Sequence, residues 1–126
     1  MVRQTLGELQ HAIMRVLWRR GEATSSDVHS ALVEERGLAP TTIATMLRKM
    51  EDKGVVGHRV VGRQFVYRPL VSESVVRQSM VGELVDRLFG GDPAELVSYL
   101  VSDHTVEPAE LERLRLLIEN RDRGEG

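Results

Sequence analysis

The chain has 126 residues, of which 41% are hydrophobic and 29% charged, as expected for one soluble globular domain or two very small ones. It contains no cysteine, which excludes disulfides, iron–sulfur clusters, thiolate zinc sites and cysteine nucleophiles. Residues 1–71 hold 11 Lys/Arg and 7 Asp/Glu, a net +4, whereas residues 72–126 hold 6 and 12, a net −6. The basic first half can face phosphate groups, and the acidic second half cannot.

The sequence gives no sign of a membrane protein or of a secreted one. No apolar run is long enough to cross a bilayer, and the opening residues "MVRQTLGELQ" lack the apolar core of a signal peptide. We therefore expect a cytoplasmic protein.

A first helix is predicted over residues 5–20. Thr5 and Glu8 have the spacing of a capping box, and Gly21 stands where a helix-ending glycine belongs. One apolar stripe at helical spacing is formed by Leu6, Leu9, Ile13, Val16 and Leu17.

Two further helices are predicted before residue 55. Thr24 and Asp27 can cap a helix over about residues 25–36. The next helix spans residues 40–53, with Pro40 at its first position, where a missing N–H costs nothing.

The helix over residues 40–53 has one apolar face and one polar face. The apolar face consists of Ile43, Met46, Leu47 and Met50 and is predicted to pack on the first two helices. Small hydroxyl side chains on the other face let the helix backbone approach a DNA groove, and they can form hydrogen bonds with the edges of the DNA bases. Basic side chains farther along the helix suit contacts with phosphates. We therefore predict DNA contacts from Thr41, Thr42, Thr45, Arg48 and Lys49.

A β-hairpin is predicted next, because β-branched and aromatic residues dominate residues 55–69. Its strands are Val56–Val60 and Gln64–Tyr67, and Arg63 beside Gly62 at the tip is a further predicted DNA contact. Three helices followed by such a hairpin match a winged helix, in which the third helix enters the major groove. We expect its core to include Leu17, Trp18, Ile43, Leu47 and Phe65.

Helical patterns return after residue 72, over residues 73–89, about 93–102 and about 108–120. The predicted fold is therefore mainly α with a small β-hairpin wing: a winged helix-turn-helix over residues 1–71 and a helical dimerisation region over residues 72–126. Dimerisation is expected because these short helices carry more leucine and valine than they can bury alone.

Four segments together resemble the penicillinase-repressor family of the BlaI/MecI type. They are LGELQHAIMRVLW (6–18), PTTIATMLRKMEDKGVV (40–56), GRQFVYRP (62–69) and ELVSYLVSDHTVEPAELERLRLLIE (95–119). The resemblance implies a dimeric repressor that binds a dyad operator and silences β-lactamase or related genes. No cofactor is expected. It also implies that Thr41, Thr42 and Thr45 face bases and that Arg63 reaches from the wing.

The sequence departs from that family at two places. Ala39 stands at a cap position where the family often has serine or threonine. Tyr99 and Leu100 align with the Asn–Phe bond that is cut in the family after a membrane sensor protease responds to the drug, so they are a possible proteolytic site. A copper-sensing branch uses a cysteine-rich C-terminus, and a chain without cysteine cannot form that metal site.

Other functions compete with DNA binding. The four histidines lack metal-ligand spacing; His104 and Glu107 are three apart, but a chance surface pair is the simpler interpretation. No catalytic triad order or phosphate-binding glycine loop is visible, so no enzyme is expected. A winged helix that binds proteins and a ligand-sensing regulator remain alternatives.

Overall fold

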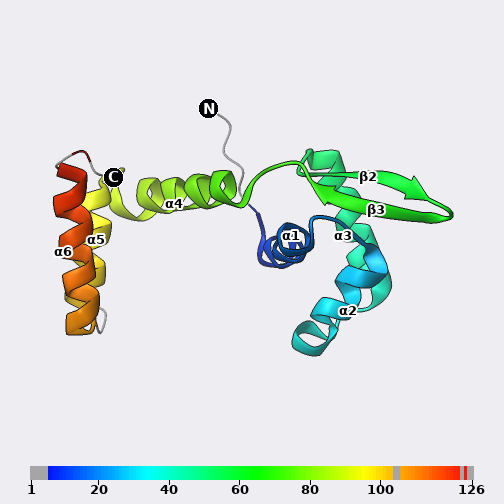
Figure 1. Ribbon diagram of the computed structural model, residues 1–126, viewed down its shortest axis with the longest axis horizontal. Helices are drawn as coiled ribbons and strands as arrows, with labels where there is room; N and C mark the ends of the chain where they lie inside the picture. The colour runs from blue at the N-terminus through cyan, green and yellow to red at the C-terminus, as the bar shows by residue number, and fades with distance from the viewer. Residues whose placement is uncertain (1–5, 104–105, 123, 125–126) are drawn as a thin grey trace. The chain divides into compact units, whose positions relative to one another are not determined.

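A computed structural model describes residues 6–103, 106–122 and 124 (Figure 1). The chain divides into two compact units between Val81 and Gly82, inside the fourth helix. The elements are α1 (Glu8–Arg20), β1 (Ala23–Thr24), α2 (Ser25–Arg36), α3 (Pro40–Lys53), β2 (Val56–Val61), β3 (Gln64–Pro69), α4 (Glu73–Phe89), α5 (Pro93–Asp103) and α6 (Pro108–Asp122).

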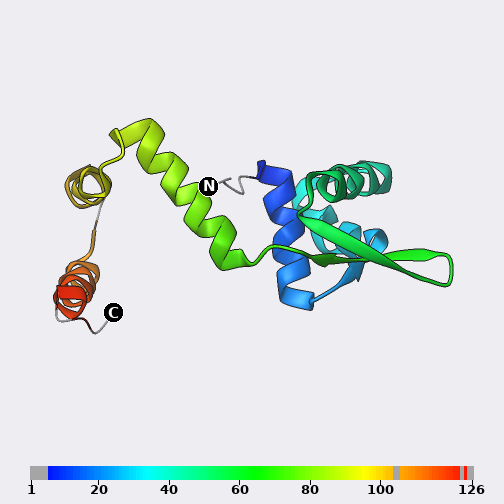
Figure 2. The same ribbon diagram turned by 90° about the horizontal axis from the view of Figure 1, so that it is seen from above.

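The first unit is a winged helix, as the sequence predicts. Its core is formed by the apolar faces of α1, α2 and α3 together with the inner ends of the strands. Figures 1 and 2 both show the β2–β3 hairpin extending away from these three helices. The largest fully buried side chains are Ile13, Met14, Leu17, Ile43, Leu47, Met50, Val28, Val55, Val56 and Val76.

Helix α1 begins later than predicted. Its N-cap is Gly7, whose N–H lies 3.5 Å from the Gln10 side-chain oxygen, and Glu8 is its first residue. The expected cap, Thr5, lies outside the described residues. The predicted end is confirmed, because Gly21 adopts a φ of 87° and its N–H donates to the Leu17 carbonyl at 2.7 Å.

The predicted capping box of α2 is confirmed. The Asp27 N–H donates to the Thr24 hydroxyl at 3.1 Å, and the Thr24 N–H donates to the Asp27 carboxylate at 3.1 Å. The bond from the Thr24 backbone lowers the pKa of Asp27. The carboxylate therefore supports the helix start above its ordinary titration range, and this support is lost as the pH falls through the lowered pKa.

Thr24→Ala is expected to lower the free energy of unfolding by about 1 kcal/mol, the usual cost of losing an N-cap side chain. Urea unfolding at neutral pH would measure it. The matched control is Ser30→Ala, an exposed position inside the same helix that should leave stability unchanged or slightly higher. Equal stability of Thr24→Ala and the wild type would show that the capping box does not hold this helix start.

The sheet has three antiparallel strands in the order β1–β3–β2. The hairpin tip is confirmed at Gly62 and Arg63, where Gly62 adopts a φ of 61°, a conformation that favours glycine. Both hairpin strands run slightly longer than predicted, to Val61 and Pro69. The pairing of β1 with β3 was not predicted, because two residues are too few to show an alternating pattern.

Phe65 was predicted to lie in the core, and this is wrong. Its side chain is 45% exposed, whereas Tyr67, two residues along the same strand face, is 4% exposed. The hairpin leaves the helices as it approaches its tip, so only its inner residues are covered. Phe65 instead stacks on the ring of His58, with ring centroids 4.0 Å apart and planes 12° from parallel.

The start of α4 belongs to the first unit. The indole N–H of Trp18 donates to the Val71 carbonyl at 2.9 Å, which fixes the segment leading into the helix. Val76 is buried in the core and Met80 packs against it. The boundary predicted after residue 71 therefore precedes the one between the compact units.

The second unit consists of the end of α4 together with α5 and α6. Asp92 caps α5, because its carboxylate accepts the Ala94 N–H at 3.0 Å, and proline is the first residue of both α5 and α6, as predicted. Among the described residues of this unit, Val85 alone is buried. No helix in the described part of the chain is both long and apolar enough to cross a membrane.

Candidate nucleic-acid interface

The outer face of α3 carries the predicted threonines. Ile43, Leu47 and Met50 are fully buried and dock the helix on the core, which leaves the opposite side free. There, a shallow hollow of about 260 Å³ is lined by Thr41, Thr42, Thr45, Met46 and Lys49. We call Thr41, Thr42, Thr45 and Lys49 the reading face.

The start of α3 has no side-chain cap. Ala39 is the N-cap residue, and its carbonyl accepts the N–H groups of Thr42 and Ile43 at 3.1 and 3.4 Å. The position of this helix start is set from outside the helix, because Nε2 of His29 in α2 lies 2.8 Å from the Leu38 carbonyl. No sequence pattern indicated this contact, since it joins a helix to a loop.

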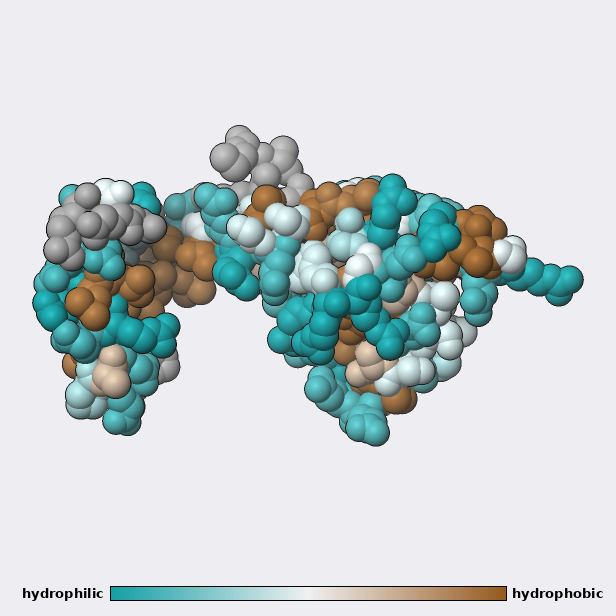
Figure 3. Space-filling model, viewed as in Figure 1, coloured by the Kyte–Doolittle hydropathy of each residue, from teal (hydrophilic) through white to brown (hydrophobic). Residues whose placement is uncertain are grey.

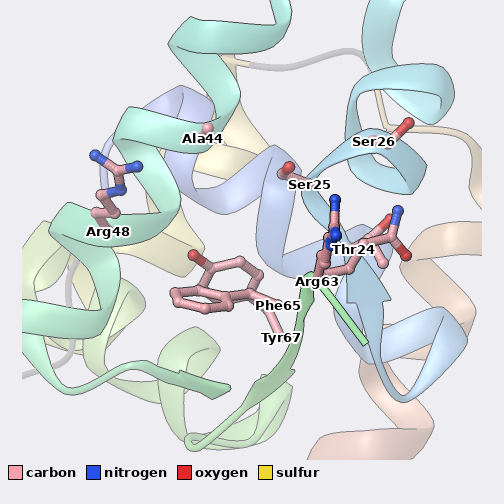
Figure 4. Close-up of a pocket in the computed structure, with 9 residues that line it drawn as sticks. Thr24, Ser25, Ser26, Ala44, Arg48, Arg63, Phe65 and Tyr67 are labelled. Carbon is pink, nitrogen blue, oxygen red and sulfur yellow. The ribbon is translucent and has the colours of Figure 1, made fainter. Parts of the chain in front are cut away.

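A second hollow lies between the start of α2, α3 and β3 (Figure 4). We call it the wing cleft. It has a volume of about 300 Å³. In Figure 4 the rings of Phe65 and Tyr67 lie between Arg48 on α3 and the start of α2. The residues lining the cleft are Thr24, Ser25, Ser26, Ala44, Arg48, Arg63, Gln64, Phe65 and Tyr67.

The structure therefore divides the predicted DNA contacts between two adjoining sites. Thr41, Thr42, Thr45 and Lys49 form the reading face, while Arg48 and Arg63 line the wing cleft. The serines of α2 and the side chains of β3 in the cleft were missed by the sequence analysis. Their only signal was the Thr-Ser-Ser run of residues 24–26, which was interpreted as a helix start.

The wing arginines differ in their surroundings. Arg59 forms an ion pair with Glu22 at 2.7 Å, and this bond raises the pKa of Arg59 and lowers that of Glu22. Arg63 at the tip is exposed and has no ion pair within the described residues. Arg63 is therefore the better placed of the two to meet an external anion.

A histidine joins the wing to α3. Nδ1 of His58 lies 2.7 and 2.8 Å from the two carboxylate oxygens of Glu51. The imidazole ring of His58 also stacks on the ring of Phe65. Burial, and then the charge of Glu51, raise the pKa of the neighbouring Tyr67. The pair connects the wing to the C-terminal part of α3.

The possible proteolytic site lies in the second unit. Tyr99 and Leu100 are both exposed and stand inside α5, and the ring of Tyr99 lies 5.9 Å from that of Phe89. A peptide bond inside a helix has to unwind locally before a protease can bind it in extended form.

Metal ligation finds no support among the described residues, where no group of three His, Cys, Asp or Glu side chains could hold an ion. Of the pair His104 and Glu107, His104 lies outside the described residues.

The similarity to known proteins covers nearly the whole chain. A family model described as penicillinase repressor matches residues 6–120. The penicillinase repressor of Bacillus licheniformis is 25% identical over 114 residues, which cover 90% of this chain and 89% of that protein. The transcriptional regulator BlaI of Mycobacterium tuberculosis (strain CDC 1551 / Oshkosh) is 32% identical over 127 residues, covering 96% and 88%.

Among solved structures, the solution structure of the DNA-binding domain of the repressor BlaI is 30% identical with a TM-score of 0.47, covering 58% of this chain and 92% of that one. The family of this chain is shown by the family model, which spans nearly the whole chain, and not by this structural similarity. The chain belongs to the penicillinase repressor family of transcriptional repressors.

Proposed function

We propose that this repressor binds a dyad operator as a homodimer, one winged helix per half-site, and controls β-lactam resistance or related genes. The family is one of repressors rather than enzymes. The observation that carries the proposal is the reading face: three exposed threonine hydroxyls and one lysine on a helix whose opposite side is fully buried.

The proposed division of labour follows from side-chain chemistry. Threonine hydroxyls can bond base edges and their methyl groups can contact thymine, so Thr41, Thr42 and Thr45 are assigned to reading. Lys49 and Arg48 meet the flanking phosphates, and Arg63 reaches the backbone or the minor groove from the wing tip. The phosphate contacts supply affinity and register, whereas the base contacts supply sequence preference.

The proposed dimer uses the second unit. Large apolar side chains are left exposed there, notably Leu88 at 71%, Leu117 at 60% and Ile118 at 55%. In Figure 3, some hydrophobic residues are visible between hydrophilic ones on the surface of α5 and α6. Apolar surface of this kind is stabilised by covering it with another subunit.

Light scattering at micromolar concentration is therefore expected to give about twice 14.2 kDa. Leu117→Asp should shift the mass toward that of a single chain, because a carboxylate would be buried without a partner in the dimer. Ala109→Asp adds the same charge to the exposed first turn of α6 and should leave the dimer intact. A wild-type monomer that binds the operator as a monomer would rule out the dimer.

Cleavage in α5 would release the operator under this proposal. Cutting the Tyr99–Leu100 bond removes α6 and part of α5 from the subunit contact while leaving the winged helix whole. A sensor protease at the membrane is the implied trigger, acting indirectly.

Selection of tight binders from a pool of random duplexes tests the proposed function. The full chain is expected to enrich an inverted repeat. Enrichment of no sequence, with binding that depends only on duplex length, would favour a winged helix that serves a different partner.

A further inference from the structure

We propose that Met46 is a site of reversible oxidation, at which a peroxide converts the thioether to a sulfoxide and thereby weakens DNA binding by the reading face. The inference rests on the proposed DNA binding of this face and adds a means of regulating it. It concerns a residue of α3 for which the sequence predicted only packing on the first two helices.

Met46 lies between the core and the reading face. Part of its side chain packs against the core, as its place on the apolar face of α3 predicts. It is nevertheless only partly buried, and it lines the hollow of about 260 Å³ together with Thr41, Thr42, Thr45 and Lys49. A peroxide molecule is little larger than water, whose share of liquid volume is about 30 Å³, so the hollow has room for it.

The other methionines of the chain are less open or lie elsewhere. Because the chain has no cysteine, methionine supplies all of its sulfur groups. Met14 and Met50 are fully buried, and Met1 lies outside the described residues. Met80 is partly buried, but it packs against the core from α4 and does not line the hollow. Met46 is therefore the one methionine of the described residues that lines the hollow of the reading face.

A side chain of α1 engages one side of the Met46 sulfur. Nε2 of Gln10 donates a hydrogen bond to Sδ of Met46 at 3.5 Å. Oε1 of the same amide accepts the Gly7 N–H at 3.5 Å, which favours the orientation that turns the nitrogen toward the sulfur. A thioether sulfur has two lone pairs and is a weak acceptor. Since Gln10 engages one lone pair, the other is left for an oxidant that enters through the hollow.

The reaction transfers one oxygen atom from hydrogen peroxide to sulfur. The free lone pair of the sulfur attacks one peroxide oxygen, so that an S–O bond forms and the O–O bond breaks. The proton on the transferred oxygen passes to the leaving hydroxide, which becomes water. Sulfur loses two electrons and the peroxide gains two. Attack on one lone pair gives one of the two sulfoxide epimers, and each epimer has its own reductase.

The added oxygen changes the surface that faces DNA. A sulfoxide is polar and chiral, whereas the thioether is apolar. Because the oxygen is added from the hollow, it can accept a hydrogen bond from the hydroxyl of Thr42, which lies one turn earlier on α3. That hydroxyl is then no longer free to meet a base. Operator binding is expected to weaken about tenfold or more, as for a polar group left without its partner.

Oxidation of the full chain by hydrogen peroxide without DNA, followed by peptide mass spectrometry, tests the site first. Met46 should be oxidised before Met14 and Met50, and mainly to one epimer, so that only one of the two epimer-specific reductases restores it. Gln10→Leu frees the second lone pair and should give both epimers. Oxidation of Met46 no earlier than that of the two buried methionines, or the same epimer mixture with and without Gln10, would overturn the inference.

The affinity for the selected operator, measured by fluorescence anisotropy before and after oxidation, tests the consequence. The wild type should lose about tenfold or more. Met80→Leu is the matched control, because it removes the other partly buried thioether, and it should lose as much as the wild type. Met46→Leu keeps a similar volume without the sulfur, so its affinity should be the same before and after treatment. Equal losses in Met46→Leu and in the wild type would overturn the inference.

The two measurements separate this inference from the proposed function. Mass spectrometry uses no DNA, so its result does not depend on an operator. An untreated wild type that selects no duplex would contradict the proposed function. A selected operator that binds equally well to the chain before and after oxidation of Met46 would contradict this inference alone.

Discussion

A fragment that ends at Val81 is expected to bind the operator on the order of 10²–10⁴-fold more weakly than the full chain, because it loses the coupling of two half-sites. The fragment retains the whole first unit, including Val76 and Met80 of the core. Residues 1–81 hold 12 Lys/Arg and 8 Asp/Glu, a net +4, so its non-specific contacts with DNA should persist. Electrophoretic mobility shifts on the dyad operator in moderate salt would measure the loss.

A shorter fragment, ending at residue 71, is the informative control. It lacks Val76, which is fully buried, and it should therefore be less stable than the fragment that ends at Val81. Circular dichroism separates that loss of fold from a loss of coupling. If the fragment ending at Val81 is folded and holds the operator as tightly as the full chain, dimerisation does not control repression.

Thr45→Ala is expected to reduce discrimination at particular base pairs by about 1–3 kcal/mol, the usual worth of a direct base contact. Arg63→Ala should instead weaken binding to all sequences and flatten the salt dependence, because a contact from the wing tip is mainly electrostatic. Competition between the operator and point-substituted operators measures the first effect, and a salt series measures the second.

Thr45→Ser is the control that separates the two parts of the threonine side chain. It keeps the hydroxyl and removes the methyl group, so it should preserve a hydrogen bond to a base and lose a contact with a thymine methyl. If Thr45→Ala and Arg63→Ala change specific and non-specific binding by the same factors, the division between reading face and wing is wrong.

The sequence predicted the helices and the hairpin because their signals are local. The apolar stripe of α1, Pro40 at the start of α3 and Gly62 at the hairpin tip depend on spacing or on backbone conformation, and all three are confirmed. The winged helix follows from the order of these elements along the chain.

The failures concern contacts between distant residues. Phe65 was predicted to be buried because it is aromatic and lies in a strand, but how far a hairpin extends beyond its helices is a tertiary property. The first half of α4 has an ordinary helical pattern, and only the packing of Val76 shows that it belongs with the first unit. The pairing of His58 with Glu51 has no sequence signature, since the two residues lie on different elements.

The wing cleft illustrates the same limit. Arg48 and Arg63 were predicted separately as DNA contacts, from a helix face and from a hairpin tip. Their place beside one hollow, together with Ser26 and Phe65, depends on how α2, α3 and β3 pack. The order of residues along the chain does not predict which side chains from different elements line the same hollow.

Dimethyl sulfate protection on the selected operator tests the central claim, that α3 reads bases in the major groove of each half-site. Dimethyl sulfate methylates guanine N7 in the major groove and adenine N3 in the minor groove, so it distinguishes the two grooves. The account predicts two symmetric patches of protected guanine N7, centred about one helical turn of roughly 34 Å or a multiple of it apart. Protection confined to adenine N3, or a single patch without a symmetric partner, would contradict it.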